Sequence, residues 1–131
     1  MSEKKILIII DEDDATRKVA LAIVSEFFGD DIRIVEAGDF EGTEILDPQL
    51  LFIGCADDKP ASFEYLEKVM AHINLAGRKC ALFSPSSDEA ISYLTDLIRD
   101  CEIRQIAKPL NSWNIIDYKT WVKDIKKESV Q

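Results

Sequence analysis

The sequence contains few of the residues on which metal centres, disulfide frameworks and nucleophilic active sites depend. It has one histidine and three cysteines in 131 residues. Cys55, Cys80 and Cys101 have no metal-ligand spacing, and their odd number does not indicate a disulfide framework. His72 falls between two apolar helix positions, so it is predicted to lie at the surface without a catalytic partner. No hydrolase, metalloprotease or P-loop pattern is present, and a reduced, cytoplasmic protein is the simplest expectation.

Basic residues and long apolar runs are also scarce. Lysine and arginine number 16 against 25 aspartates and glutamates, which gives a net charge of −9. This balance disfavours nucleic acid and anionic membranes as partners. The apolar run near the start, Ile6–Ile10, is too short for a signal-peptide core or a membrane span, so neither is expected. The length and the 47% hydrophobic content predict one globular domain covering residues 1–131.

The first apolar segment dominates the pattern that is present. A strand is predicted over Lys4–Ile10, and its run of isoleucine and leucine has no polar face, which is typical of the centre of a parallel sheet. Four acids, Asp11–Asp14, follow at once, and helical spacing then predicts a helix over about Thr16–Phe28. Either Asp13 or Asp14 is expected to cap this helix, because a carboxylate accepts hydrogen bonds from its free N–H groups.

Strand and helix patterns then alternate along the rest of the chain. Ala37–Leu46 is predicted to be a loop with one helical turn, Ser62 to cap one helix, and Ser86 with Glu89 to form the capping box of the next. Trp113 and Trp121 are expected to seal the last helix against the sheet. The remaining predicted strands are Ile32–Val35, Leu50–Gly54, Lys79–Phe83 and Ile103–Ala107, and the remaining helices centre on Phe63–Ile73, Ala90–Ile98 and Tyr118–Ile125.

This alternation predicts an α/β protein with a three-layer, doubly wound sheet of five parallel strands in the order 2-1-3-4-5. The strands over Lys4–Ile10 and Leu50–Ile53 should be adjacent and central, because both are apolar on each face. The predicted core consists of Ile6, Ile8, Ile10, Val19, Ile23, Leu51, Ile53, Leu66, Val69, Leu82, Leu94 and Ile98.

Four segments in this order resemble the flavodoxin-like family over roughly residues 4–125. They are Lys5–Ile9 before a loop and Thr16–Ala20, then Leu51–Cys55, and finally Leu75–Ser84 with its leucine, glycine and basic pair before a strand. The resemblance implies the same sheet and a flavin mononucleotide (FMN) bound at its carboxyl edge, with the phosphate in a loop rich in hydroxyl groups and glycine.

The sequence departs from the family where that flavin would lie. The loop after the first strand carries acids, and only Thr16 keeps a family hydroxyl. A carboxylate about 6 Å from a phosphate charge repels it by roughly 2–3 kcal/mol at an effective dielectric of about 20. The loops Cys55–Ala61 and Ser84–Glu89 contain no aromatic residue that would stack on the flavin. We therefore expect no cofactor and no catalytic residues, and predict an interaction or regulatory module with an unknown protein partner and an oligomeric state that the sequence does not indicate.

Two other functions stay open. One is an FMN-dependent electron-transfer flavodoxin with an atypical phosphate loop. The other is an atypical receiver domain of a response regulator, in which the acids would hold Mg²⁺ and Lys108 would be the lysine after the fifth strand. It would lack the phosphoacceptor aspartate, because Gly54 stands at that position.

These alternatives place any ligand at the carboxyl edge of the predicted sheet, and the residues there form the candidate ligand edge. A weak divalent-cation site is predicted at Asp11, Asp13 and Asp14. Cys55 is predicted to be a structural cysteine, because nearby acids would raise the pKa of its thiol. The complete edge consists of Asp11, Glu12, Asp13, Asp14, Thr16, Gly54, Cys55 and Ser84.

Overall fold

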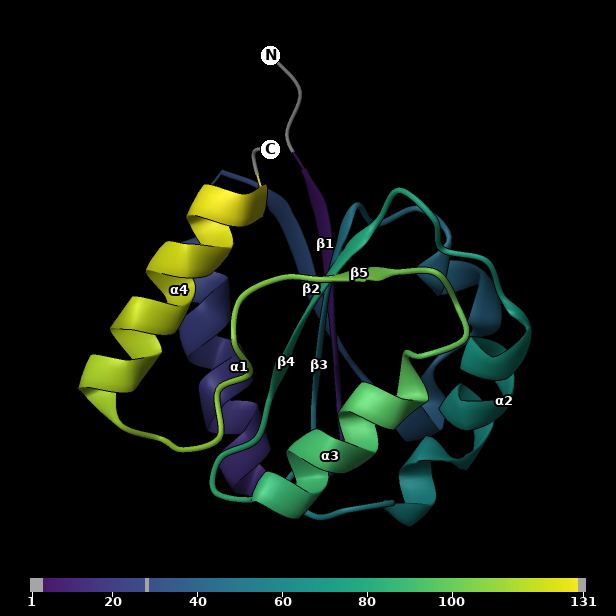
Figure 1. Cartoon of the computed structure of the whole chain (residues 1–131), viewed down its shortest axis with the longest axis horizontal. Helices are drawn as coiled ribbons and strands as arrows, with labels where there is room; N and C mark the ends of the chain where they lie inside the picture. The colour runs from purple at the N-terminus through teal and green to yellow at the C-terminus, as the bar shows by residue number, and fades with distance from the viewer. Residues whose placement is uncertain (1–3, 28, 130–131) are drawn as a thin grey trace.

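The structure is a computed structural model that describes residues 4–27 and 29–129, so Phe28, the predicted end of the first helix, lies outside the described residues. Strands and helices alternate along the chain (Figure 1). The strands are β1 (Lys5–Ile10), β2 (Asp31–Glu36), β3 (Leu50–Gly54), β4 (Lys79–Phe83) and β5 (Arg104–Gln105). The α-helices are α1 (Asp14–Glu26), α2 (Glu64–His72), α3 (Asp88–Leu97) and α4 (Ile115–Ser129), and three 3₁₀ turns are η1 (Ala37–Asp39), η2 (Gly42–Ile45) and η3 (Ala61–Phe63).

The five strands form one parallel sheet in the order β2-β1-β3-β4-β5, which confirms the predicted fold class and strand order. β1 and β3 lie side by side, with Ile6 opposite Leu50 and Ile10 opposite Gly54. Five of the six β1 residues and all five β3 residues are buried, as the apolar runs predict. The carboxyl ends of these central strands therefore meet at one edge of the sheet, at the bottom of Figure 1.

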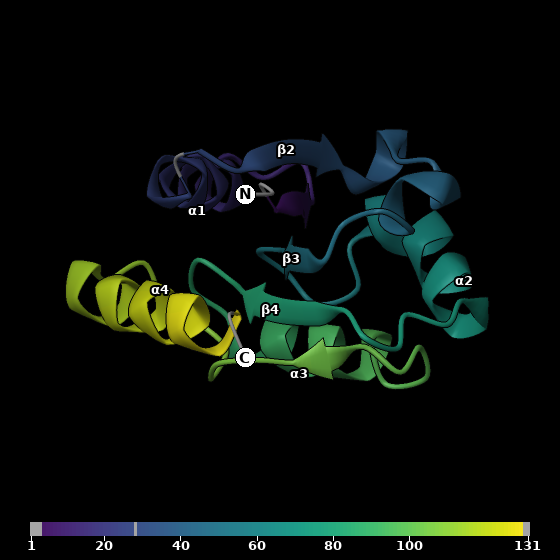
Figure 2. The same ribbon diagram turned by 90° about the horizontal axis from the view of Figure 1, so that it is seen from above.

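Helices cover both faces of the sheet. α1 and α4 lie on one face, and α2 and α3 on the other (Figures 1 and 2). Because side chains alternate along a strand, Ile6, Ile8 and Ile10 belong to the core on the α1 and α4 face, whereas Leu7 and Ile9 belong to the opposite core. No helix in the described part of the chain is long and apolar enough to cross a bilayer.

The predicted core is confirmed with one exception. All of its members are buried except Val69, which is partly exposed and packs against the core from its margin. The two tryptophans differ from the prediction. Trp121 is buried against Phe52 and Phe83, with ring centroids 5.7 and 5.9 Å away, but Trp113 keeps 47% of its surface exposed. Trp113 does not seal α4, because it precedes the helix and packs against Tyr118 near the start of that helix.

Two predicted helix caps are wrong. α2 is preceded by η3, and Phe63 occupies its N-cap position without a side-chain hydrogen bond, so Ser62 does not cap it. At α3 the cap is Ser87, whose Oγ accepts a hydrogen bond from the Ala90 amide at 3.1 Å. The predicted capping box started one residue too early.

The last strand is shorter than the predicted Ile103–Ala107. Only Arg104–Gln105 pair with β4, and a single bridge joins Phe83 to Leu110 further along. Glu102 and Ala107 adopt φ angles of 67° and 60°, in the left-handed region that interrupts a strand. Pro109 also lacks the N–H that a continuing strand would supply.

Removing a central isoleucine should test the strand placement. Ile8 and Ile53 are fully buried on opposite faces of the sheet. We expect Ile8→Ala or Ile53→Ala to lower the free energy of unfolding by about 2–5 kcal/mol, because a cavity adds to the lost transfer energy. Urea denaturation followed by circular dichroism measures this difference. Leu21→Ala is the control, since Leu21 is 56% exposed, and equal losses at all three positions would contradict the assigned layers.

Candidate functional site

The loops that follow β1, β3 and β4, together with the start of α1, form the carboxyl edge, which comprises residues 11–16, 54–61 and 84–87. Every residue of the predicted ligand edge belongs to it. The structure brings the first and second loops into direct contact through Asp11, and Ser84 begins the third loop directly after β4. That these residues bind a ligand stays a prediction, and the hydrogen bonds within the edge determine which of their polar groups remain available.

Asp11 is a buried carboxylate with only 6% of its surface exposed. Its Oδ2 accepts a hydrogen bond from the Ala56 amide at 2.8 Å, and its Oδ1 accepts one from the Asp13 amide at 3.3 Å. Both oxygens are therefore engaged by backbone N–H groups from two loops. Such charge-assisted hydrogen bonds are stronger than neutral ones, so Asp11 ties the loop after β1 to the loop after β3.

Asp13 occupies the start of α1. Its Oδ1 accepts a hydrogen bond from the Ala15 amide at 2.8 Å, and its backbone is extended, as an N-cap requires. This confirms Asp13 as the cap. Glu12 and Asp14 are exposed. Of the four consecutive acids, Asp11 and Asp13 thus accept hydrogen bonds from the protein's own backbone, and all except Asp11 are exposed.

A shallow hollow of about 600 Å³ adjoins these acids. Asp11, Glu12, Asp13 and Asp57 line it without a lysine, arginine or histidine. Its remaining lining consists of Gly38, Pro60, Ala61 and Ser62. The hollow therefore repels anions.

The acids do not converge as metal ligands in this arrangement. Within residues 4–27 and 29–129, no group of three or more histidine, cysteine, aspartate or glutamate side chains is placed to hold a metal ion. A cation at Asp11 and Asp13 would compete with the amides of Asp13, Ala15 and Ala56. The weak divalent-cation site stays a prediction without a preformed set of ligands.

Thr16 carries the one hydroxyl shared with the family pattern at this loop. It is fully buried, and its Oγ1 has no hydrogen-bond partner among the described residues. A buried hydroxyl without a partner costs free energy. Thr16 lies in the first turn of α1, three residues after Asp13 in the chain.

Gly54 is required by packing. A Cβ at this position would lie 2.3 Å from the ring of Phe83, which stands opposite Gly54 in the β3–β4 register. Ser84 follows Phe83 and is fully buried. Its amide donates to the Leu110 carbonyl at 2.7 Å and its Oγ accepts from the Ser87 amide at 3.2 Å. Both residues therefore have structural roles in building the edge.

Cys55 is buried, and burial raises the pKa of its thiol to about 12, with further increases from Asp11, Asp57 and Asp58. The thiol is thus held in its protonated, unreactive form. Burial likewise raises the pKa of Cys80 and of Cys101. The structure agrees with the interpretation of Cys55 as a structural cysteine.

Aromatic side chains close to the carboxyl edge are engaged in packing, as the Phe83 ring beside Gly54 is. Phe63 is fully buried, and the Tyr93 hydroxyl donates to Glu67 Oε2 at 2.6 Å. Phe40 packs against Tyr65, with ring centroids 5.9 Å apart. The last four rings are committed to α2, α3 and the connection after β2.

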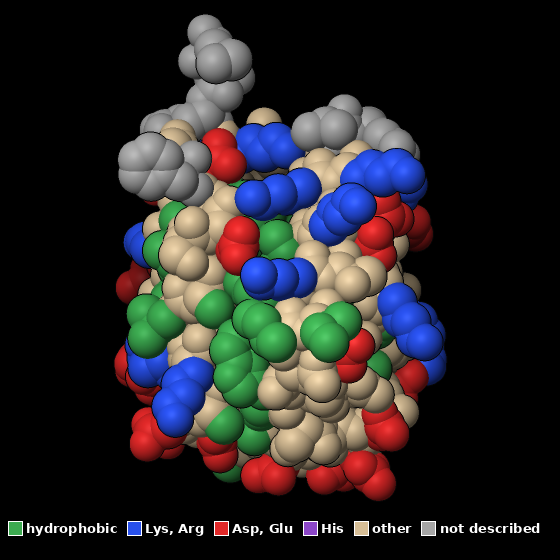
Figure 3. Space-filling model, turned by 90° about the vertical axis from the view of Figure 1, so that its left-hand side faces the viewer, with side chains coloured by type: hydrophobic (Ala, Val, Ile, Leu, Met, Phe, Trp, Pro, Cys, Tyr) green, Lys and Arg blue, Asp and Glu red, His purple; other side chains and the backbone are tan. Residues whose placement is uncertain are grey.

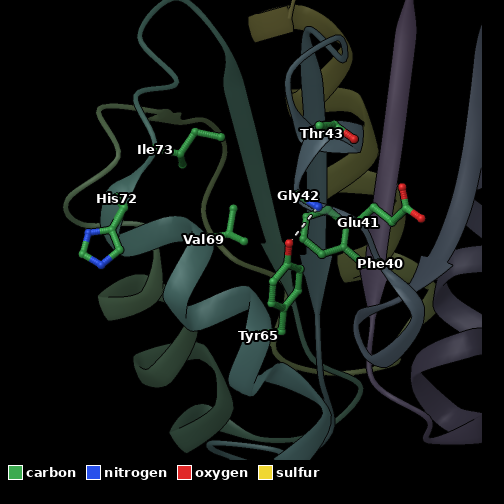
Figure 4. A pocket seen from close by; sticks show the side chains of 8 residues that line it. All are labelled: Phe40, Glu41, Gly42, Thr43, Tyr65, Val69, His72 and Ile73. Atoms are coloured by element: carbon green, nitrogen blue, oxygen red, sulfur yellow. Dashed lines mark hydrogen bonds between the residues drawn. The ribbon is translucent and has the colours of Figure 1, made fainter.

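The sequence did not indicate a second hollow, of about 590 Å³, between that connection and α2 (Figure 4). It exists because η1 and η2 replace a full helix between β2 and β3, which leaves one side of α2 uncovered. Tyr65 crosses the gap and accepts a hydrogen bond from the Gly42 amide at 3.1 Å. Val69, His72 and Ile73 form its other wall. The feature of the sequence that could have indicated this hollow is the short span between β2 and β3, residues 37–49.

Comparison with known proteins places the fold. Neither protein-family models nor curated proteins match the chain. Among solved structures, it is similar to flavodoxin 2 from Bacillus cereus, with a TM-score of 0.83, 17% identity and coverage of 95% of this chain and 99% of that one. A short-chain flavodoxin associated with a PDU bacterial microcompartment gives a TM-score of 0.83 at 8% identity, with 98% and 99% covered. Fusobacterium nucleatum flavodoxin bound to FMN gives 0.77 at 16% identity, with 95% and 98% covered.

These similarities define the class of the fold. The chain has a flavodoxin-like fold over almost its whole length, and the neighbouring structures are themselves covered nearly completely. At identities of 8–17% the likeness concerns the backbone arrangement.

The contact between Gly54 and Phe83 yields a test of the edge. Gly54→Ala should lower the free energy of unfolding by about 1–3 kcal/mol, because the new methyl group overlaps the Phe83 ring. Gly38→Ala is the matched control, since a Cβ there meets its nearest atom at 3.8 Å. Thermal and urea denaturation of both variants measure the difference. A Gly54→Ala variant as stable as Gly38→Ala would contradict the packing of the Phe83 ring over Gly54.

Proposed function

We propose that this protein combines a flavodoxin-like fold with a carboxyl edge that no longer binds FMN, and that it acts as a non-catalytic interaction or regulatory module in the cytoplasm. The observation that carries the proposal is the carboxylate of Asp13 at the N-terminus of α1. The resemblance to flavodoxins implies that a flavin phosphate would bind at this place. Here a side chain of the protein itself supplies the negative charge.

The backbone donors support this interpretation. A helix N-terminus binds a phosphate through free N–H groups and its dipole. The amides of Asp13, Ala15 and Ala56 already donate to Asp11 or Asp13. A phosphate would have to displace a carboxylate and then stand beside the others, each repelling it by roughly 2–3 kcal/mol at about 6 Å before solvent screening. The residues present do not fit the phosphate.

The ring of a flavin also lacks evident partners. The loops 55–61 and 84–89 contain no aromatic side chain, and Cys55 and Ser84 are buried. Aromatic stacking would add about 0.5–1.5 kcal/mol for each pair beyond the buried area. With neither a phosphate cradle nor a stacking partner, tight FMN binding has no source in this edge.

An FMN-dependent electron-transfer protein with an atypical phosphate loop is the second candidate. Two observations favour it. The F. nucleatum flavodoxin with a similar fold is bound to FMN. The buried Thr16 hydroxyl lacks a partner among the described residues and would gain one from a phosphate that reached it. This candidate requires the Asp13 carboxylate to leave the helix end.

A receiver domain is the third candidate and has less support. A receiver carries its phosphoacceptor aspartate at the end of the third strand, where this chain has Gly54. The space beside Gly54 is filled by the Phe83 ring, at 2.3 Å from the position of a Cβ. The edge therefore has no room for a carboxylate at that point.

Titration with FMN separates the first two candidates. We expect the purified protein to be colourless and FMN fluorescence to show no saturable quenching up to micromolar protein, because the phosphate site holds carboxylates. The apo-protein of the F. nucleatum flavodoxin is the positive control. Saturable quenching at micromolar concentrations or below would overturn the proposal and favour electron transfer.

The contribution of Asp13 is tested by its own variants. Asp13→Asn keeps a good N-cap and removes the charge, whereas Asp13→Ala removes both. We expect Asp13→Ala to cost about 0.5–2 kcal/mol of stability and Asp13→Asn much less. Equal, negligible losses in urea denaturation would show that the Asp13 carboxylate does not occupy the helix end.

A further inference from the structure

A hollow of about 280 Å³ lies between α4 and the chain segment that follows β5. Residues 107–112 of this segment run alongside the helix in the opposite direction (Figure 1). Two hydrogen bonds fix this course: the Ala107 amide donates to Glu128 Oε2 at 2.8 Å, and the Ser112 hydroxyl donates to Asp117 Oδ2 at 3.4 Å. The hollow thus has one wall from the segment and one from α4, and none of its lining residues belongs to the carboxyl edge.

Charged side chains of both signs line this hollow. Lys108 belongs to the segment after β5, whereas Asp117 and Asp124 belong to α4 and lie about two helical turns apart on one side of it. In the described part of the chain, none of the three forms an ion pair, either with each other or with another residue. One positive and two negative charges therefore face the hollow without a charged partner.

The buried Trp121 lines the hollow between the two aspartates. Its ring packs against Phe52 and Phe83, with centroids 5.7 and 5.9 Å away, which fixes it in the core. Its indole N–H has no acceptor among the described residues, and a buried polar group without a partner is a requirement that the fold alone leaves unmet. An aromatic surface flanked by carboxylates suits an alkyl stem that carries a cation.

The surface around α4 does not select a ligand of one charge sign. Figure 3 shows the side of the molecule on which α4 lies, with lysine and arginine side chains toward its upper part and acidic ones along its lower edge. Lys119 and Lys123 of α4 are exposed but do not line the hollow. They are turned round the helix by about 100–160° from Asp117 and Asp124. The charges that a ligand in the hollow must match are therefore those of Lys108 and the two aspartates.

We propose that this hollow binds a basic α-amino acid, of the class that comprises lysine, ornithine and arginine. Such a molecule carries one carboxylate and two cationic groups, which is the inverse of the charges that line the hollow. Its α-carboxylate would pair with Lys108, its α-ammonium with Asp124 and its side-chain cation with Asp117, while its stem covers Trp121.

The course of the two walls gives this order. Lys108 follows Ala107, which is hydrogen-bonded to Glu128 near the end of α4, so Lys108 lies closer to Asp124 than to Asp117 along the helix. Two turns of helix separate the two aspartates by about 10 Å along its axis. The extended stem of a basic amino acid and the two carboxylate side chains bridge this span together.

Ligands that carry only one sign of charge are disfavoured by the same three residues. A diamine would bring a cation toward Lys108, and a carboxylic acid without an amine would approach Asp117 and Asp124. Like charges at such short range repel each other. The proposal extends the regulatory function proposed above by a small-molecule ligand, but binding itself does not depend on the state of the carboxyl edge.

Titration with L-lysine and three analogues tests the site. Cadaverine lacks the carboxylate, 6-aminohexanoate lacks the α-ammonium, and L-norleucine lacks the side-chain cation. At neutral pH and fixed ionic strength, we expect L-lysine to shift the ¹⁵N–¹H resonances of residues 108–124 and of the Trp121 indole saturably, with half-saturation at about 1 mM. Each analogue should bind about fivefold more weakly, as the loss of one exposed ion pair predicts.

Variants of the three charged residues assign each pairing. Lys108→Met, Asp117→Asn and Asp124→Asn should each weaken L-lysine binding by about fivefold. Each variant should have no such effect on the analogue that already lacks the matching charge. Lys108→Met should therefore not weaken cadaverine binding, Asp124→Asn should not weaken 6-aminohexanoate binding, and Asp117→Asn should not weaken L-norleucine binding.

Matched controls separate this site from general attraction to an acidic protein. Lys123→Met and Asp100→Asn remove exposed charges outside the hollow and should leave the affinity unchanged. The proposal would be overturned by equal weakening in these controls, by analogues that bind as tightly as L-lysine, by shifts confined to other residues, or by no saturable shift up to about 10 mM L-lysine. Because none of these measurements involves FMN, a failure here is distinct from flavin binding at the carboxyl edge.

Discussion

The arrangement of the carboxyl edge depends on the buried carboxylate of Asp11, which accepts backbone hydrogen bonds from the loops after β1 and β3 at once. Removing a buried charge from water is costly unless hydrogen bonds replace the lost solvent, and here two amides do so. Engaging the Asp13 amide also places the Asp13 side chain at the first turn of α1, where it accepts from Ala15. One buried carboxylate thus positions the second, and together they use the donors with which an α/β edge of this kind binds anions.

The interior of the protein and its edge therefore follow different constraints. The interior meets the requirements of a parallel sheet covered on both faces. Its central strands are apolar and buried, and Gly54 leaves room for the Phe83 ring. The edge instead directs carboxylates toward its own backbone amides and leaves the Thr16 hydroxyl without a partner in the described structure. A fold does not determine the chemistry at its loops. Likeness to flavodoxins at 8–17% identity is explained by the interior alone, which leaves function to be argued from the edge.

Prediction from the sequence succeeded where one strong pattern had no competitor. The apolar runs of β1 and β3 admit only a central, two-sided position, and they correctly predict strand order and nearly all of the core. Prediction failed where two neighbouring residues were equally able to cap a helix. Ser86 was predicted to cap α3, but Ser87 does so. Prediction also failed at β5, where the left-handed backbone of Ala107 depends on tertiary contacts, including a hydrogen bond from its amide to Glu128 Oε2 at 2.8 Å. Composition revealed which groups lie at the edge, but only the folded structure shows that Asp11 and Asp13 bind backbone amides.

The residues at the start of α4 are apolar but exposed, although their composition suggests burial. Trp113 and the two isoleucines at 115 and 116 are apolar enough to be core residues, yet Tyr118, Trp121, Val122 and Ile125 already fill the face of α4 that meets the sheet. No inward position is left for the earlier side chains, and Asn114 ends the preceding loop by capping the helix between them. Exposed apolar surface offers no stability to an isolated chain. The three exposed side chains at the start of α4 are therefore what remains once the helix positions that face the sheet are filled.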